Sequence, residues 1–273
     1  MSRKLLDDCF LHDKDRMRHD DAVALIRERT SPVTGMETVV LSQAHGRVLA
    51  EQYAAPQNIP AFNNAAVDGY AFDGQDLKPD SDAKFSVVTR IAAGHAPQRA
   101  LKKGEAARIF TGAVMPEGAD TCLMQEDAKV DGTQLLVPKG LKPGAKTRLA
   151  GEDVKQGEVM LQAGQRLRPQ DVAAIASGGA GQIKVFERLR VGLISTGDEI
   201  IRPGNILGDG KVYDSNHHLL RGLLDTVGAE AVDYGVIPDE QVRVERAVRT
   251  AAHECDIILT TGGASRGAAD FIV

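Results

Sequence analysis

Hydrophobic and polar positions follow two different patterns over the first half of the chain. Between residues 19 and 53 apolar residues recur at helical spacing in two stretches, residues 19–30 and 41–53, and Asp20 or Asp21 is expected to cap the first helix. From about residue 70 to 147 the apolar runs are short, and Asp131-Gly132 separates two of them. This part is predicted to be rich in β-strands, with a hairpin turn at Asp131-Gly132.

The second half alternates strands with helices. Residues 159–187 predict a short strand, a helix ending at Gly178 and another strand. Beyond them, buried strands and amphipathic helices are predicted in turn at residues 189–196, 214–228, 230–238, 239–254 and 255–263. Asp214 and Gly228 stand where the cap and the stop of one helix are expected. This order predicts a parallel, doubly wound sheet.

Composition narrows the class of protein. The chain has 273 residues, 42% of them hydrophobic and 26% charged, with a net charge of −5. This length suggests two domains, and the absence of a long basic run argues against nucleic acid as a partner. Cys9, Cys122 and Cys255 are too far apart for a zinc knuckle or a disulfide framework. The charged start and the lack of a run of about 20 apolar residues predict a cytoplasmic protein without a membrane span.

Candidate chemistry gathers where the predicted parallel strands end. These ends carry "STGDE" at 195–199, "IPDE" at 237–240 and "TTGGASRG" at 260–267. Ligands of open parallel sheets bind beyond the carboxyl ends of the strands. Glycines let the backbone approach a ligand and offer amides to phosphate oxygens, while Ser and Thr add hydroxyl groups.

Carboxylates accompany the same strand ends. Asp198, Glu199, Asp239 and Asp270 are expected to converge on one rim of the sheet. Carboxylates repel a phosphate unless a cation lies between them, and Mg²⁺ accepts oxygen ligands from both. The rim therefore predicts a Mg²⁺-dependent site for a phosphorylated or pyrophosphorylated ligand.

Each of these features has a simpler interpretation when it is taken alone. "TTGG" is also typical of a tight strand-to-helix turn, Asp239 of a helix cap, and Glu199 of a solvated loop acid. "FNNAAVDGYAF", residues 62–72, is compatible with a loop that satisfies its own polar groups through Asx turns. Arg148, Glu152 and Asp153 form either an anion-and-acid corner or only a turn. His217 and His218 have no partner at metal-ligand spacing and are expected on the surface or partly packed.

Six motifs taken in order resemble one family. They are "FNNAAVDGYA", "RIFTGAVMPEGAD", "RLAGEDVKQGE", "GLISTGDEI", "GDGKVYDSN" and "LTTGGASRGAADF". Together they are similar to the signature motifs of the molybdopterin molybdenumtransferases, which are related to the E domain of gephyrin. The resemblance covers residue 18 to the last residue. It implies insertion of molybdenum from molybdate into adenylylated molybdopterin, with release of AMP and with a divalent metal.

The resemblance also implies site residues. The expected catalytic residues are Asp68, Thr111, Asp153, Glu199, Asp239 and Asp270. The expected cofactor-binding residues are Thr196, Gly197, Asp214, Asn216, Thr261, Gly262, Gly263 and Ser265. Metal binding is expected from Asp198, Glu199, Asp239 and Asp270. The family is a homodimer with its site between subunits, so that Asp68 and Thr111 would serve the partner's pocket. A molybdopterin adenylyltransferase and molybdoenzyme maturation proteins are further expected partners.

The expected architecture is α/β with a β-rich inserted domain. Residues 18–55 and 148–187 form a discontinuous dimerisation domain, residues 56–147 the insertion, and residues 188–273 a Rossmann-like molybdopterin-binding domain of parallel strands. Family members continue well beyond "ADF", so that the last domain is expected to be incomplete at its C-terminus and the activity weak or absent. Two alternatives are a non-catalytic scaffold of the gephyrin type and the related adenylyltransferase. The inserted segment and the "DGYA" motif argue against the adenylyltransferase.

Overall fold

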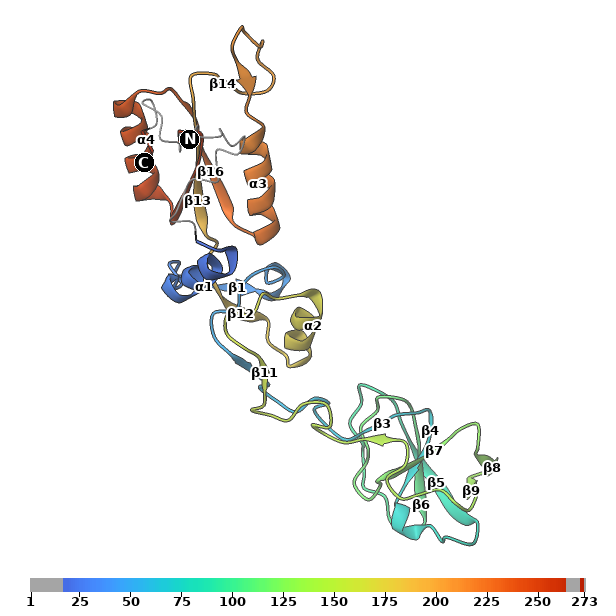
Figure 1. The fold of residues 1–273 in the computed structure, drawn as a ribbon. Coiled ribbons are helices and arrows are strands. Elements are labelled where there is room, and N and C mark those ends of the chain that lie inside the picture. Colours follow the sequence, from blue (N-terminus) through green and yellow to red (C-terminus); the bar gives the residue numbers. More distant parts are fainter. Residues whose placement is uncertain (1–16, 264–270, 273) are drawn as a thin grey trace, which may run out of the picture. The chain divides into compact units, whose positions relative to one another are not determined.

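The computed structural model describes residues 17–263 and 271–272 (Figure 1). The chain divides into two compact units, Met36–Glu187 and a second unit that combines Met1–Gly35 with Arg188–Val273. Each unit buries its own hydrophobic clusters, three in the first and one in the second among the described residues. No helix in this described part is both long and apolar enough to cross a bilayer.

Within the first unit, segments far apart in sequence share one small core. Strand β1 (Met36–Val40) pairs antiparallel with β12 (Gln182–Phe186), and β2 (Tyr53–Ala54) pairs with β11 (Val159–Leu161). Helix α2 (Pro169–Ser177) ends at Gly178, as the sequence predicts. Fully buried residues from both segments join the helix in this core, namely Leu49, Leu167, Ile175 and Val185.

The middle part of this unit's sequence forms a six-stranded sheet in the order β7-β4-β6-β5-β9-β8. Its strands in chain order are β4 (Gly69–Phe72), β5 (Ala83–Ile91), β6 (Glu105–Ile109), β7 (Thr121–Met124), β8 (Lys129–Asp131) and β9 (Gln134–Val137). The hairpin predicted at Asp131-Gly132 is confirmed, since Asp131 pairs with Gln134. Neighbouring residues such as Ala71 and Phe72 enter different clusters, so both faces of the sheet are covered.

The second unit is built on three parallel strands. Strand β13 (Arg190–Thr196) lies between β16 (Glu230–Ile237) and β17 (Ile257–Thr261) and runs parallel to both. Helices α3 (Ser215–Val227) and α4 (Gln241–Glu254) lie on opposite sides of this sheet (Figure 1). Because both faces are covered, β13 is buried at every position after Arg190.

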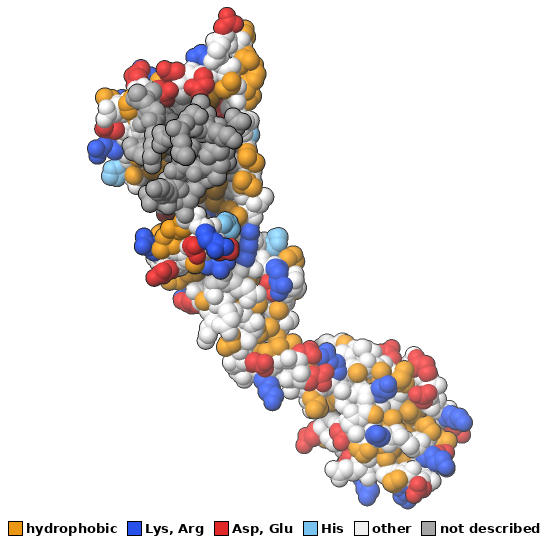
Figure 2. Space-filling model, in the orientation of Figure 1, with side chains coloured by type: hydrophobic (Ala, Val, Ile, Leu, Met, Phe, Trp, Pro, Cys, Tyr) orange, Lys and Arg blue, Asp and Glu red, His pale blue; other side chains and the backbone are white. Residues whose placement is uncertain are grey.

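A loop projects from the end of the central strand. Residues 197–213, called the β14–β15 loop, contain β14 (Ile200–Ile201) and β15 (Val212–Tyr213), which pair in parallel. Apolar side chains are exposed on this loop and along the outer face of α3 (Figure 2). They include Ile206, Leu219, Leu223 and Val227.

The prediction of a helix at residues 41–53 is wrong. Only a short 3-10 turn, η1 (Leu41–Gln43), forms there, and Gly46 then adopts a positive φ of 77°. The chain instead bonds to a distant segment, with the Gly46 amide donating to the Leu167 carbonyl and the Leu49 amide to the Gln165 carbonyl. Tertiary pairing therefore outweighs the helical spacing of the apolar residues here.

The first predicted helix does form, as α1 (His19–Arg29), but its details differ. Its cap position is Arg18, without a side-chain cap, so neither Asp20 nor Asp21 caps it. None of its residues is buried, and Ile26 is 63% exposed. The acids instead stand in its first turn, where they oppose the positive end of the helix dipole.

Candidate functional site

A pocket of about 410 Å³ lies at the carboxyl ends of β13 and β17. Six residues expected from the sequence line it: Thr196, Glu199, Asp214, Asn216, Thr261 and Gly262. They come from two strand ends, the β14–β15 loop and the first turn of α3. The size is within the range of small-molecule sites, and the location is the one expected for a ligand of a parallel sheet.

Two glycines bring the backbone after β17 close to β13. Gly262 and Gly263 have φ values of 89° and 59°. A Cβ on Gly262 would lie 2.2 Å from the carbonyl oxygen of Thr196, and one on Gly263 would lie 2.8 Å from its Oγ1. Only glycine allows this approach, so the turn sits directly on the end of the central strand, beside the pocket.

Helix α3 begins at the pocket. Ser215 and Asn216 in its first turn line the pocket, and Asn216 donates a 2.8 Å hydrogen bond to the Thr261 hydroxyl. This bond joins the helix to the end of β17. The first amides of a helix are without intrahelical partners and carry positive partial charge, so this side of the pocket favours an anion.

Polar groups are buried around the pocket without full hydrogen bonding. Asp214 is 4% exposed and its Oδ1 accepts from the His217 amide at 3.0 Å, which caps α3 as predicted. Burial alone would raise the pKa of Asp214, but the Ser195 hydroxyl, the His217 amide and Arg202 outweigh it and lower that pKa. Asp214 Oδ2 and Thr196 Oγ1 have no hydrogen-bond partner among the described residues.

Three of the four expected metal ligands lie at this rim, in two arrangements. The Asp198 amide donates to the Asp239 carboxylate at 3.2 Å, and the Asp239 amide donates to Asp198 at 3.3 Å. Glu199 instead lines the pocket. No three His, Cys, Asp or Glu side chains of the described residues gather into a metal-binding group. The acids therefore do not form a complete metal cage among themselves in this part of the chain.

Two further expected residues form a pair in the first unit, just before β4 and just after β6 of the six-stranded sheet. The Thr111 amide and hydroxyl both donate to Asp68 Oδ1, at 2.8 and 2.7 Å. These two bonds, with Arg108 nearby, hold the pKa of Asp68 below its usual value. Asp68 is therefore a fixed, ionised carboxylate.

Asp153 belongs to a separate corner of the first unit. Arg148 donates from Nη2 to both oxygens of Asp153 at 2.7 Å, and from Nε to Glu152 at 2.5 Å. Glu152 also accepts from the Leu149 amide at 2.8 Å. Arg148 thus fixes the orientation of the Asp153 carboxylate. This part of the chain is an ion-paired turn, and its arginine is not free to bind an anion.

The remaining expected residues divide into two groups. Gly197 lies against the pocket, since a Cβ there would be 2.7 Å from Glu199 Oε2. Ser265 and Asp270 lie outside the described residues. The sequence reasoning missed Ser195, Tyr213 and Ser215, which also line the pocket. All three lie inside the quoted motifs "STGDE" and "GDGKVYDSN", so their place in these motifs was the available signal.

The expectation of a surface or partly packed position is wrong for His217. This histidine is 4% exposed, whereas His218 is exposed. His217 Nε2 lies 3.7 Å from Asp233, and its Nδ1 has no hydrogen-bond partner in the described chain. Burial lowers the pKa of His217, and Asp233 opposes that effect.

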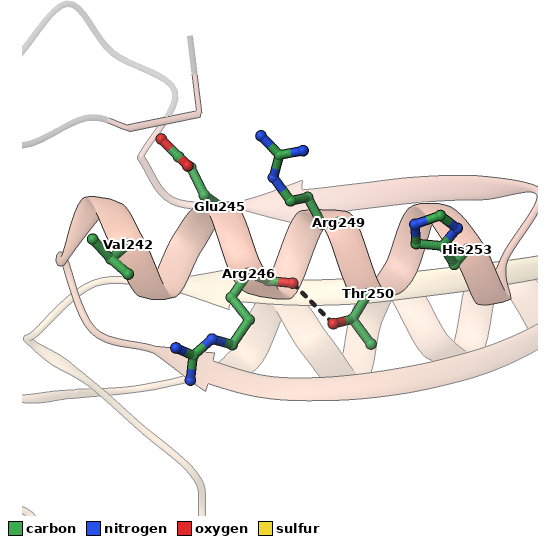
Figure 3. Close-up of a pocket in the computed structure, with 6 residues that line it drawn as sticks. All are labelled: Val242, Glu245, Arg246, Arg249, Thr250 and His253. Atoms are coloured by element: carbon green, nitrogen blue, oxygen red, sulfur yellow. Dashed lines mark hydrogen bonds between the residues drawn. The ribbon is translucent and has the colours of Figure 1, made fainter.

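A second hollow, of about 350 Å³, lies on the outer face of α4 and shows a different arrangement. It is lined only by residues of that helix, among them Arg246, Arg249 and Thr250. Figure 3 shows the two arginines leaving the helix in different directions, while Thr250 donates to the Arg246 carbonyl at 2.9 Å. No second element contributes to this hollow, whereas two strand ends, a loop and a helix meet at the other pocket, so the pocket at the strand ends is the better candidate site.

Residues 17–179 match the family described as "MoeA N-terminal region (domain I and II)". This match covers more than half of the chain. The chain belongs to the MoeA family. Residues 192–273 match a second description, "Probable molybdopterin binding domain", and this stretch contains the pocket at the strand ends.

Individual members of the MoeA family are similar along most of the chain. A "Molybdopterin molybdenumtransferase" of Haemophilus influenzae is 37% identical over 92% of this chain and 62% of its own length. One of the same name from Nostoc is 35% identical over 86% of this chain and 55% of its own length. The chain thus spans about six tenths of the length of these relatives.

Solved structures agree with this assignment. A molybdopterin biosynthesis MoeA protein of Pyrococcus horikoshii superposes with a TM-score of 0.81 at 35% identity. The superposition covers 89% of this chain and 65% of that protein. The fold of the chain is therefore MoeA-like, with mixed α/β parts and a β-rich part.

Proposed function

We propose that this chain binds adenylylated molybdopterin at the strand-end pocket and serves the insertion of molybdenum from molybdate, with release of AMP. The observation that carries the proposal is the set of Glu199, Asn216, Thr261 and Gly262 around one pocket at the carboxyl ends of parallel strands. The amides of the glycine turn and of the α3 N-terminus suit phosphate oxygens. The names of the MoeA relatives support the reaction.

Mg²⁺ is part of this proposal. Mg²⁺ commonly uses one or two protein carboxylates and takes its other ligands from substrate phosphates and water. The carboxylates present fit that mode, since Glu199 lines the pocket and Asp198 and Asp239 form a pair at the same rim. Glu199 would hold the ion, with Asp198, Asp239 and Asp270 as further candidates. The ion would neutralise phosphate charge and polarise the bond to the leaving AMP.

The remaining site residues are proposed to act on a second subunit. Asp68 with Thr111, and Asp153 with Arg148, are rigid groups of the first unit. In a homodimer they would contribute to the partner's pocket. The exposed apolar residues on α3 support such an assembly. A cytoplasmic location and contacts with a molybdopterin adenylyltransferase and molybdoenzyme maturation proteins belong to the same proposal.

We also propose the domain division and the Rossmann-like class of the last domain. Pairing of β1 with β12 and of β2 with β11 supports a discontinuous domain at residues 18–55 and 148–187. The six-stranded sheet lies inside residues 56–147, which supports the insertion. Three parallel strands with a helix on each side support the Rossmann-like class for residues 188–273.

Binding of the adenylylated pterin, measured by equilibrium dialysis with and without Mg²⁺, tests the proposed function. We expect Mg²⁺ to tighten binding to the native chain by roughly tenfold, since it would replace repulsion between Glu199 and phosphate by attraction. Glu199→Gln should lose most of this Mg²⁺ effect. Glu245→Gln removes an equal charge from α4 and should keep it.

Two outcomes would contradict the proposed function. One is a native chain that binds neither molybdopterin nor its adenylylated form, which would favour a scaffold role. The other is an equal Mg²⁺ effect in Glu199→Gln and in Glu245→Gln, which would place the metal away from the pocket.

A further inference from the structure

Arg202 lies in the β14–β15 loop and contacts two carboxylates from two other elements. Its Nη2 donates to Asp233 Oδ1 of β16 at 2.7 Å, and its Nη1 lies 3.6 Å from Asp214 Oδ2 at the start of α3. The Arg202 side chain is 24% exposed and that of Asp214 is 3% exposed. One guanidinium thus joins three elements, with a buried carboxylate on one side and the 43% exposed Asp233 on the other.

Two of the three elements joined by Arg202 line the pocket, and the third, β16, supplies the anchor Asp233. The β14–β15 loop carries Glu199 only three residues before Arg202, and its Val212 amide donates to the Glu199 carbonyl at 2.8 Å. Asp214 caps α3, whose first turn presents Asn216 to the pocket. Asp233 is itself fixed, because its Oδ1 accepts from the Gly235 amide at 2.8 Å.

The charges around Arg202 indicate that it neutralises the buried Asp214 carboxylate. Asp214 is buried and ionised, and a buried carboxylate without a countercharge is strongly destabilising. The other groups that face this place are Asp233 and His217, with His218 beside them. Burial keeps the pKa of His217 low, so Arg202 is the permanent cation of the group. A planar guanidinium can serve two carboxylates at once, whereas an ammonium group acts as a single point charge.

We propose that Arg202 is a positioning residue that holds the β14–β15 loop, and with it Glu199, against the N-terminus of α3. Arg202 does not line the pocket itself. It sets the shape of the pocket wall by neutralising Asp214 while it is anchored on Asp233. This inference rests on the proposed function only for the identity of the ligand, which is molybdopterin or its adenylylated form.

Hydrogen exchange of the full chain, followed by NMR, tests the proposal without any ligand. The amides of Val212 and Asp214 donate to the carbonyls of Glu199 and Ile201 and report whether the loop is in place. In Arg202→Gln we expect both to exchange roughly tenfold faster, while amides within α4 keep their protection. Arg202→Lys retains the positive charge but lacks the planar guanidinium, so its exchange rates at Val212 and Asp214 should lie between those of the native chain and of Arg202→Gln. Arg243→Gln breaks an exposed ion pair with Glu240 and should match the native chain.

A titration of the His217 ring adds a readout of charge, because Arg202→Lys keeps the positive charge that Arg202→Gln removes. Burial lowers the pKa of His217 first, and the positive charge of Arg202 lowers it further. Removing that charge beside Asp233 and Asp214 should raise the His217 pKa in Arg202→Gln. The pKa in Arg243→Gln should remain native.

Three results separate this inference from the proposed function. Native-like exchange of Val212 and Asp214 in Arg202→Gln would overturn the positioning role. Faster exchange together with unchanged affinity for molybdopterin would overturn the claim that the loop shapes the pocket, for which we expect roughly tenfold weaker binding. If the native chain binds no molybdopterin, the proposed function fails, and the exchange data alone decide whether Arg202 holds the loop.

Discussion

At the scale of single residues, buried carboxylates in this protein are stabilised by an arginine together with backbone amides. Asp214 has Arg202 and the His217 amide, and Asp171 has Arg168. Asp171 is 4% exposed and accepts from the Arg168 backbone amide at 2.8 Å and from its Nε at 2.9 Å. The Arg168 side chain and then its amide lower the pKa of Asp171 to about 2.

Asp171→Asn should destabilise the chain at neutral pH by about 1 kcal/mol, because α2 loses its capping carboxylate. Because the folded-state pKa is depressed, the stabilisation is present above the ordinary value of 3.8 and is lost as pH falls towards about 2. Denaturant unfolding of both proteins across this range measures the difference. Asp127→Asn removes an exposed acid of the same unit and should show no such dependence. A constant difference down to the acid limit would refute the ion-pair explanation.

At the scale of elements, the ends of strands and helices determine where the pocket lies. The turn after β17 approaches β13 because Gly262 has no side chain, and α3 begins beside it because Asp214 caps its first turn. Both features place polar backbone groups at the same edge of the sheet. The chemistry of the pocket therefore depends on conformations that few residue types adopt.

Gly262→Ala should lower the free energy of unfolding by more than the 1–2 kcal/mol typical of a positive φ, because the added Cβ would meet the Thr196 carbonyl at 2.2 Å. Gly210→Ala is the matched control, since Gly210 also has a positive φ of 74° but no atom within 4 Å of the added Cβ. Urea unfolding compares the two. Equal losses would show that the turn relaxes without affecting β13.

At the scale of the whole molecule, the chain consists of two units with separate cores. Ile109 is 0% exposed in a cluster of Met36–Glu187, and Leu193 is 2% exposed in the cluster of the other unit. Separate cores allow separate unfolding, so that a single two-state transition is not expected. A mutation in one core should therefore leave the other unit nearly unchanged.

Calorimetry should show two transitions. Ile109→Ala should lower one of them, and Leu193→Ala should lower the other, each by about 2–5 kcal/mol of unfolding free energy. Each variant serves as the control for the other. One shared transition that moves equally in both variants would mean that the units unfold together.

Local order along the chain was predictable from the sequence wherever neighbouring residues decide it. The caps at Asp214 and Gly228 and the turn at Asp131-Gly132 depend on backbone conformations within a few residues. The position of the pocket at strand ends also followed from the order of strands and helices. These features require no knowledge of which surfaces meet.

Only the tertiary structure decided the rest. Residues 41–53 have apolar residues at helical spacing, but they form hydrogen bonds with a segment more than a hundred residues away instead of a helix. His217 is buried beside Asp233. The acids of the rim divide, with Asp198 and Asp239 bonding to each other and Glu199 lining the pocket. The physical reason is that long-range pairing and the burial of charge depend on which elements pack together, and the spacing of residues along one segment does not contain that information.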